Sequence, residues 1–194
     1  TAYPYRGGLA AFNERLANEL SKQHQLSIHT FTLQYPDFLF PGKTQYADGP
    51  APEGLTIKRS ISSVNPINWL IAGKQIAAEQ YDLVLVGFWL PFMGPCLGTI
   101  SRLVNCPVVA IIHNIIPHEP NPGDVQFARY FCGGCDGFIS LTDSVANDLK
   151  RFIKQKPSEV SPHPVYDHYG ARESRETALA ALGLFYYYDY LLFF

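Results

Sequence analysis

A short apolar run that ends abruptly in polar residues is the feature that most constrains the fold of this chain. Val108 to Ile112 contains only Val, Ala and Ile, and His113 and Asn114 follow directly. Strands of a parallel sheet are covered by helices on both faces and therefore read as continuous apolar runs, and ligands bind beyond their carboxyl ends. The run predicts a buried parallel strand that carries His113 and Asn114 to a ligand-binding edge.

Similar apolar runs alternate with helical periodicity along the rest of the chain, which is typical of a doubly wound sheet. We expect strands at 26–33, 55–61, 82–88, 108–112, 138–141 and 159–161, and helices at 9–20, 66–80, 91–104, 125–131, 143–153 and 172–182. The predicted fold class is α/β: a Rossmann-like, doubly wound, mostly parallel sheet with helices on both faces. The chain opens at a turn and a helix, where a βαβ unit would have a strand, so we expect the first strand to be missing.

Composition sets the broad class of protein. The chain has 194 residues, of which 47% are hydrophobic, so it can bury a core of its own. The net charge of −2 and the scattered Lys and Arg residues argue against a nucleic-acid partner. No apolar run reaches the roughly 18 to 20 residues that a membrane span needs, and Thr1 opens neither a signal nor a transit peptide. We therefore expect a cytoplasmic protein.

The sequence contains four cysteines, and two of them, Cys132 and Cys135, flank a pair of glycines. A Cys-x-x-Cys segment serves either as a dithiol redox motif or as half of a zinc site. The chain has no second such pair and no His pair at zinc spacing. The favoured interpretation is therefore two small buried thiols at the end of a helix, with a thiol redox role as the alternative.

Two further features could take part in binding. Gly7 and Gly8 lie immediately before the first predicted helix, where the backbone could approach an anion closely and the free amides of the first turn would face it. A plain turn is the other interpretation of this glycine pair. His113 could donate a hydrogen bond to a hydroxyl group or move a proton near neutral pH, although a core histidine bonded to backbone has the same pattern.

The loops after two strands supply the remaining candidates. Trp89 follows the strand at 82–88 and could stack on a ring or simply pack in the core. His118 and Glu119 lie beyond His113, but their spacing is not that of a helical His-Glu-x-x-His motif, so a loop wall is favoured over a metal site. Thr142, Asp143 and Ser144 are expected to cap a helix. The chain has no Gly-x-Ser-x-Gly elbow, P-loop or complete Gly-x-Gly-x-x-Gly motif.

Four segments in order resemble the N-terminal half of a GT-B glycosyltransferase of the family 4 type, over roughly residues 1–166. They are Pro-Tyr-Arg-Gly7-Gly8 with its helix, the strand Tyr81-Asp-Leu-Val-Leu-Val, the strand end Ile-Ile-His113-Asn114 and the segment Ile139-Ser-Leu-Thr142-Asp-Ser144. One departure is Ser161-Pro-His163-Pro164, which stands where the family often has Pro-Asn-Gly. The resemblance implies that residues 1–170 are the acceptor-side domain and that residues 171–194 are a linker helix and the start of a truncated second domain, with a strand at 190–194.

The resemblance also implies an activity. The parent enzyme would transfer a sugar, as a hexosyltransferase, from a nucleotide-sugar to an acceptor hydroxyl with retention, with no metal and no cofactor. Gly7 and Gly8 would bind the donor diphosphate, His113 would be the catalytic residue, and the acceptor side would be formed by Trp89, Asn114, His118 and Glu119. The acceptor would be a carbohydrate or a lipid-linked molecule, and peripheral membrane association would be compatible with it.

The second domain of that family carries most of the nucleotide site, so we expect the present chain to be inactive without the C-terminal domain of the same parent. A noncatalytic Rossmann-like module that binds a phosphate or a nucleotide is the alternative function. Both hypotheses place the ligand at the same edge of the sheet.

Overall fold

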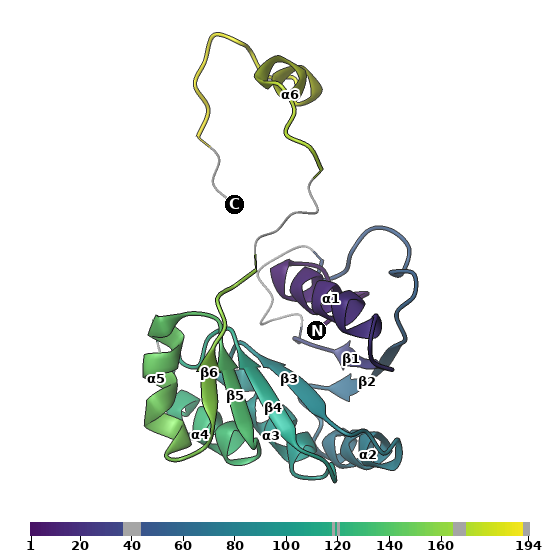
Figure 1. Cartoon of the computed structure of the whole chain (residues 1–194), viewed down its shortest axis with the longest axis vertical. Helices are drawn as coiled ribbons and strands as arrows, with labels where there is room; N and C mark the ends of the chain where they lie inside the picture. Colours follow the sequence, from purple (N-terminus) through teal and green to yellow (C-terminus); the bar gives the residue numbers. More distant parts are fainter. Residues whose placement is uncertain (37–43, 118, 120, 165–169, 192–194) are drawn as a thin grey trace. The chain divides into compact units, whose positions relative to one another are not determined.

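The computed structural model describes residues 1–36, 44–117, 119, 121–164 and 170–191. Residues 1–162 form one compact unit and residues 163–194 another. The elements of the first unit, drawn in Figure 1, are α1 (Gly8–Ser21), β1 (Ile28–Leu33), β2 (Ile57–Ser62), α2 (Pro66–Ala78), β3 (Val84–Phe88), the 3₁₀ turn η2 (Pro91–Met93), α3 (Gly94–Ser101), β4 (Val108–Ile112), α4 (Asp124–Gly133), β5 (Gly137–Ser140), α5 (Asp143–Ile153) and β6 (Ser158–Val160). The second unit contains α6 (Arg175–Ala181).

The described strands form two parallel sheets, one of order β1-β2 and one of order β3-β4-β5-β6. In the larger sheet Val84 lies opposite Val108, and Phe88 lies opposite Ile112. Ile112 in turn lies opposite Ser140 of β5, so the carboxyl ends of β3, β4 and β5 meet at one edge. The predicted parallel α/β architecture is confirmed. The described elements begin with α1, and no strand precedes it among them.

The main core lies on one face of the larger sheet and extends under β1 and β2. Helices α2, α3 and α4 pack against this face, and α3 contacts both of its neighbours. The core holds the stacked rings of Phe88 and Phe131, whose centroids are 4.1 Å apart. Other members are Phe31, Ile61, Ala72, Ile76, Met93, Cys96, Ile100, Val108, Ala110, Ile112, Ala128 and Phe138. Burial of this much apolar surface is the largest favourable contribution to folding.

Helix α1 covers the opposite face of the same sheet. Its Phe12 forms a small second core with Ile111 of β4 and Leu141, and Leu16 and Ile139 pack at the edge of this cluster. Side chains alternate between the two faces of a strand, so Ile111 points toward α1 while Ala110 and Ile112 point toward the main core. Helices therefore lie on both faces of the sheet, as predicted, although α1 covers only part of its face and Leu85 of β3 remains exposed.

Helix α3 is shorter than the sequence pattern predicts. We expected a helix over 91–104, but the segment begins with a 3₁₀ turn and α3 ends at Ser101. Gly94 and Gly98, one turn apart on α3, permit a close approach of α4: a Cβ atom at Gly94 would lie 2.4 Å from the carbonyl oxygen of Phe127. Any larger residue at these two positions would push α4 away, which explains why α3 contains glycines in its interior.

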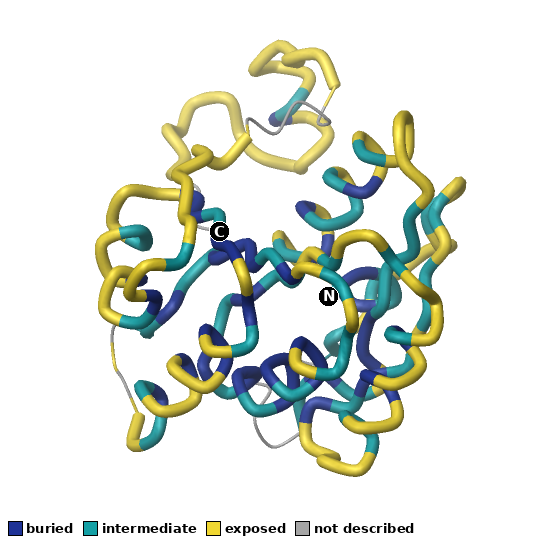
Figure 2. Tube along the Cα trace, turned by 60° about the horizontal axis from the view of Figure 1, so that its bottom comes forward, coloured by how far each residue is buried: buried dark blue, intermediate teal, exposed yellow. Residues whose placement is uncertain are grey.

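The second unit is mostly exposed, apart from Leu179 of α6 (Figure 2). Ser174 caps α6 by accepting a hydrogen bond from the backbone N–H of Thr177. Leu182 is the C-cap residue of α6, and Gly183 follows it with a φ of +66°, so the helix ends at the predicted glycine but one residue before it was expected to cap. The strand expected at 190–194 is not found at Tyr190 and Leu191, and residues 192–194 lie outside the described part. None of the described helices of the chain has the length and apolar character needed to cross a bilayer.

Candidate functional site

The carboxyl edge of the larger sheet places His113 beside the end of β3. The backbone N–H of His113 donates a hydrogen bond of 2.9 Å to the carbonyl oxygen of Phe88. The ring of Phe12 meets the imidazole edge-on, with centroids 4.9 Å apart and an angle of 87° between the ring planes. His113 is half-buried. It is therefore held between β3 and α1 at the edge where parallel α/β sheets bind ligands.

The start of α1 is open and carries no side-chain cap. Gly7 is the N-cap residue with a φ of 114°, a conformation that L side chains rarely adopt, and the first turn of the helix contains no acidic residue. A Cβ atom added at Gly7 or at Gly8 would meet no other atom within 4 Å. By contrast, Thr142 caps α5 by accepting a hydrogen bond of 3.2 Å from the N–H of Val145, as predicted. The glycine pair thus leaves the amino end of α1 accessible to an anion.

Several backbone contacts hold the glycine loop, which we define as residues 3–8. Glu14 of α1 accepts a hydrogen bond of 2.6 Å from the N–H of Tyr3. The N–H of Arg6 donates to the carbonyl oxygen of Gln45, and the N–H of Ala47 donates to that of Pro4. The loop is thus attached both to its own helix and to the segment that precedes β2.

Trp89 lies at the same edge, directly after β3, and its indole is already hydrogen-bonded. Its Nε1–H donates a hydrogen bond of 2.6 Å to the hydroxyl oxygen of Tyr35. Its ring meets Phe31 at 6.2 Å between centroids, nearly at a right angle. Trp89 is half-buried, and Tyr35 and Phe31 hold its ring as an anchored aromatic wall, which agrees with the packing interpretation. Stacking on a ligand ring stays a prediction.

Sequence reasoning missed Gln34 and Tyr35, which follow β1 directly. The N–H of Gln34 donates a hydrogen bond of 3.1 Å to the hydroxyl of Tyr5 in the glycine loop. Burial raises the pKa of Tyr35, although the hydrogen bond from the indole of Trp89 opposes the increase. The signal was available: both residues lie where an apolar strand ends, which is the same position that identified His113.

The other predicted site residues differ in how well the structure places them. Asn114 is half-buried next to His113, whereas Glu119 is exposed on the segment before α4. His118 lies outside the described residues. Within the described ranges, no three His, Cys, Asp or Glu side chains come together as a metal site would require.

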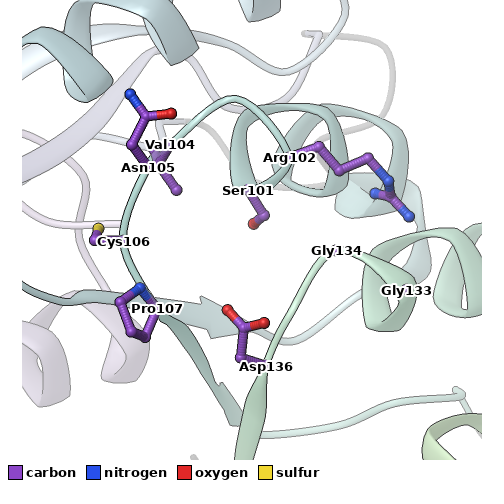
Figure 3. Close-up of a pocket in the computed structure, with 9 residues that line it drawn as sticks. All are labelled: Ser101, Arg102, Val104, Asn105, Cys106, Pro107, Gly133, Gly134 and Asp136. Atoms are coloured by element: carbon purple, nitrogen blue, oxygen red, sulfur yellow. The ribbon is translucent and has the colours of Figure 1, made fainter.

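A hollow of about 490 Å³ lies at the other end of the sheet, among the loops before β4 and β5 (Figure 3). Ser101 and Asp136 are directed toward its middle in Figure 3. Asp136 also accepts a hydrogen bond of 2.8 Å from the N–H of Val108, so it holds the start of β4. This hollow lies at the amino ends of the strands, whereas parallel α/β sheets bind their ligands at the carboxyl ends, where His113 lies.

The glycines between Cys132 and Cys135 accommodate Arg102. A Cβ atom at Gly133 or Gly134 would lie 2.8 or 2.7 Å from a guanidinium nitrogen of Arg102. That guanidinium donates to the carbonyl oxygens of Gly98 and Tyr130, both at 2.6 Å. The pair thus permits close packing of α3 against the end of α4.

The two thiols themselves are buried and not bonded to each other. Burial raises the pKa of Cys132 and that of Cys135 to about 12. A redox dithiol needs the opposite shift, because the thiolate is the reactive form. The geometry supports the packing interpretation of this segment and argues against a redox role.

The comparisons with known proteins agree with the geometry. Residues 6–168 match the family model for Glycosyltransferase Family 4. The matched range includes the end of the glycine loop, all of α1 and every described strand. A search of curated proteins gave no match. On the family match, which covers most of its length, the chain belongs to glycosyltransferase family 4.

Proposed function

We propose that this glycosyltransferase domain forms the acceptor side of an enzyme that transfers a hexose from a nucleotide-sugar to an acceptor hydroxyl, with retention of anomeric configuration. One observation carries the proposal: the open, uncapped start of α1 lies about one helical turn before Phe12, whose ring contacts the imidazole of His113 at the end of β4. One helix thus connects an anion-binding feature with a group that can bond a sugar hydroxyl.

The donor diphosphate is proposed to bind at Gly7 and Gly8. A leaving diphosphate carries negative charge that must be stabilised in the transition state, and preorganised amides at a helix start supply part of that stabilisation. Neither glycine has a side chain to block the approach, and the first helical turn has no carboxylate to repel the ligand. Both features favour a phosphate-bearing group over a neutral one.

The acceptor is proposed to lie along the loops that follow β3 and β4. His113 would be the catalytic residue, bonding a hydroxyl of the transferred sugar or of the acceptor. Asn114 and the anchored ring of Trp89 would form the wall of the acceptor site, with His118 and Glu119 beyond them. The acceptor, by this proposal, is a carbohydrate or a lipid-linked molecule.

The rest of the enzyme is proposed to come from a second domain of the same parent. Residues 1–170 would then be the N-terminal domain, and residues 171–194 the linker helix and the start of the C-terminal domain. In the family, a pair of glutamates and basic residues that face the diphosphate belong to the second domain, so the nucleotide site would be incomplete here and this chain alone would be inactive. We propose further that the enzyme needs no metal and no cofactor besides the donor, and that it acts in the cytoplasm.

A transfer screen on the full-length protein tests this function. Nucleotide-sugars and hydroxyl acceptors are incubated with the full-length protein and, separately, with the 194-residue chain. We expect product only with the full-length protein, and an NMR coupling constant of the product that shows the donor's anomeric configuration. Binding of nucleotides without any transfer would instead support the noncatalytic module. Turnover by the 194-residue chain alone would contradict the two-domain account.

A further inference from the structure

Helix α2 is apolar on its outer face as well as on its inner face. The inner face buries Ala72 and Ile76 in the main core, and Gly73 permits close packing against Leu103 after α3. The outer face is solvent-exposed and nevertheless consists mainly of aliphatic side chains. A helix that is apolar all round is normally covered on both sides, so this outer face predicts a second apolar contact.

The exposed aliphatic side chains form one surface, which we call the α2 patch and define as Val64, Ile67, Leu70 and Ile71. Their exposed fractions lie between 43% and 69%. Positions 67, 70 and 71 are three and four residues apart and therefore lie on one face of the helix. Val64 precedes the helix in a turn that Asn65 fixes, because its side chain accepts hydrogen bonds from two N–H groups of the first helical turn.

The charge beside the α2 patch is positive. Helix α2 contains no Asp or Glu, and Lys74, its single charged residue, is exposed on the same face, one turn after Leu70. Glu79 follows the helix, but its carboxylate lies 2.5 Å from the ammonium of Lys58, which balances its charge. A lysine stem can lie along apolar surface while its ammonium reaches outward. The patch therefore has a cation at its border.

The α2 patch lies toward the carboxyl edge of the domain, at the start of α2 and beside the end of β2 (Figure 1). The N–H of Ser62, the last residue of β2, donates a hydrogen bond of 2.6 Å to Asn68, and its carbonyl oxygen accepts one of 2.7 Å from the indole of Trp69. The thiol of Cys96, near the start of α3, donates to the same oxygen. Helix α3 follows the carboxyl end of β3 and Trp89, so the patch and the aromatic wall belong to the same edge.

The composition of the α2 patch favours a lipid surface over a protein partner. Protein interfaces are enriched in Tyr, Trp, Phe, Met and Arg and depleted of Lys, whereas the patch is aliphatic and borders on Lys74. Helices that lie in a membrane interface combine an apolar face with lysines beside it. With 13 residues, α2 is too short to span a bilayer but suits a position in its surface.

We propose that the α2 patch docks on an anionic lipid surface, with its aliphatic side chains against the acyl chains and Lys74 against the headgroups. This contact would hold the carboxyl edge of the domain next to a bilayer. Lipid binding requires neither the donor nor catalysis, so the inference goes beyond the proposed reaction, and either can fail while the other stands.

Co-sedimentation of the 194-residue chain with vesicles tests the docking. Vesicles that contain phosphatidylglycerol and phosphatidylcholine are compared with vesicles of phosphatidylcholine alone. The triple substitution Ile67→Gln, Leu70→Gln and Ile71→Gln should lower the partition coefficient on the mixed vesicles by about tenfold or more, because three aliphatic side chains no longer insert. Lys74→Gln should lower it by about fivefold on the mixed vesicles and leave binding to phosphatidylcholine unchanged.

Leu83→Gln is the matched control for these substitutions. Leu83 and Leu70 have the same exposed fraction, 48%, but Leu83 lies just before β3 and outside the patch. Its substitution should leave the partition coefficient unchanged. All the substituted side chains are exposed, and a circular dichroism unfolding curve for each variant checks that the fold is kept.

Methyl NMR locates the contact without any substitution. The chain is mixed with bicelles of phosphatidylglycerol and phosphatidylcholine that carry a nitroxide-labelled lipid. We expect the methyl signals of Ile67, Leu70 and Ile71 to broaden, while those of Leu83 stay sharp. Leu191, which is exposed in the second unit, reports on the alternative that the aromatic tail binds the lipid instead.

The remaining outcomes would overturn the proposal. Vesicle binding that survives the triple substitution, or broadening of Leu191 with no effect on the patch, would place the lipid contact elsewhere. Equal binding of the unaltered chain to both kinds of vesicle would contradict the role of Lys74. Absence of vesicle binding, together with a dimer in analytical ultracentrifugation that the triple substitution dissociates, would show that a second copy of the chain covers the patch.

Discussion

The two ends of the larger sheet differ in which polar side chains they carry. At the amino ends of β4 and β5, charged side chains bond to backbone atoms, as Asp136 does to Val108. Lys156 likewise donates to the carbonyl oxygens of Cys132, Gly133 and Cys135. At the carboxyl ends of β3 and β4, the polar side chains are instead the indole of Trp89, the imidazole of His113 and the amide of Asn114. The comparison teaches that charged side chains hold backbone in place at one edge, while directional polar groups and the uncapped start of α1 lie at the other edge, where we propose the site. Substitutions at the two edges should therefore have different consequences.

The largest effect should come from His113 at the carboxyl edge. We expect His113→Ala to lower kcat/KM for transfer by the full-length protein by about 100-fold, equivalent to about 2.7 kcal/mol. His24→Ala, at an exposed position after α1, is the control and should leave transfer unchanged. Steady-state kinetics with a thermal unfolding curve for each variant make the measurement. Unchanged transfer in His113→Ala would remove this residue from the mechanism.

Lys156 at the amino edge should affect stability instead. Lys156→Met leaves three carbonyl oxygens at the end of α4 without their charged donor, and we expect the free energy of unfolding to fall by about 2 kcal/mol. Urea denaturation measures this change. Lys150→Met removes an exposed ammonium that donates to Asn147 in the same helix, and it should cost less than about 0.5 kcal/mol. If the two substitutions lowered the free energy of unfolding equally, the hydrogen bonds of Lys156 would contribute no more to stability than an exposed lysine does.

A pair of glycine substitutions compares the two edges directly. Gly134→Ala places a Cβ atom 2.7 Å from Arg102 and 3.0 Å from a backbone oxygen, so we expect a loss of about 1 to 2 kcal/mol in unfolding free energy. Gly8→Ala meets open space at a helix start and should not destabilise the fold. It should nevertheless weaken pyrophosphate binding by about threefold or more. Destabilisation by Gly8→Ala, or loss of binding in Gly134→Ala, would reverse the assignment of the two edges.

The smallest effect concerns pH and His29, near the amino end of β1. Burial lowers the pKa of His29, and the nearby Lys58 lowers it further, while Glu79, 3.7 Å from the imidazole, raises it in part. The folded state therefore takes up a proton less readily than the unfolded chain. Stability should be complete above the unfolded pKa and should decrease as the pH falls from there toward the lower, folded pKa. Denaturation curves of the unaltered chain and of His29→Gln, recorded across this range, should converge at the acidic end.

The regular elements could be predicted closely where one physical signal dominates. The run at Val108–Ile112 and the helix at Asp143–Ile153 have the predicted bounds, because one is uniformly apolar and the other begins at a capping threonine. The end of α3 was predicted three residues too late, at Val104. Apolar residues there continue the helical pattern into the loop that turns toward β4.

The parts that the sequence did not predict depend on contacts between distant residues. Arg102 explains the glycines at 133 and 134, but no local pattern connects positions so far apart in the sequence. Gln34 and Tyr35 were likewise missed: the strand end at Leu33 was predicted, but the contacts of these two residues with Tyr5 and Trp89 join distant parts of the chain. His113 and Trp89 were found because each follows a strong strand. Their contact partners, Phe12 and Tyr35, could be identified only from the three-dimensional structure.

A crystal structure of the full-length protein with a bound nucleotide-sugar tests the assignment of the carboxyl edge most directly. The account predicts that the diphosphate lies within hydrogen-bond distance of the amides at Gly7 and Gly8 and that the sugar contacts His113. Density for the ligand in the hollow beside Asp136, with the start of α1 left vacant, would contradict it.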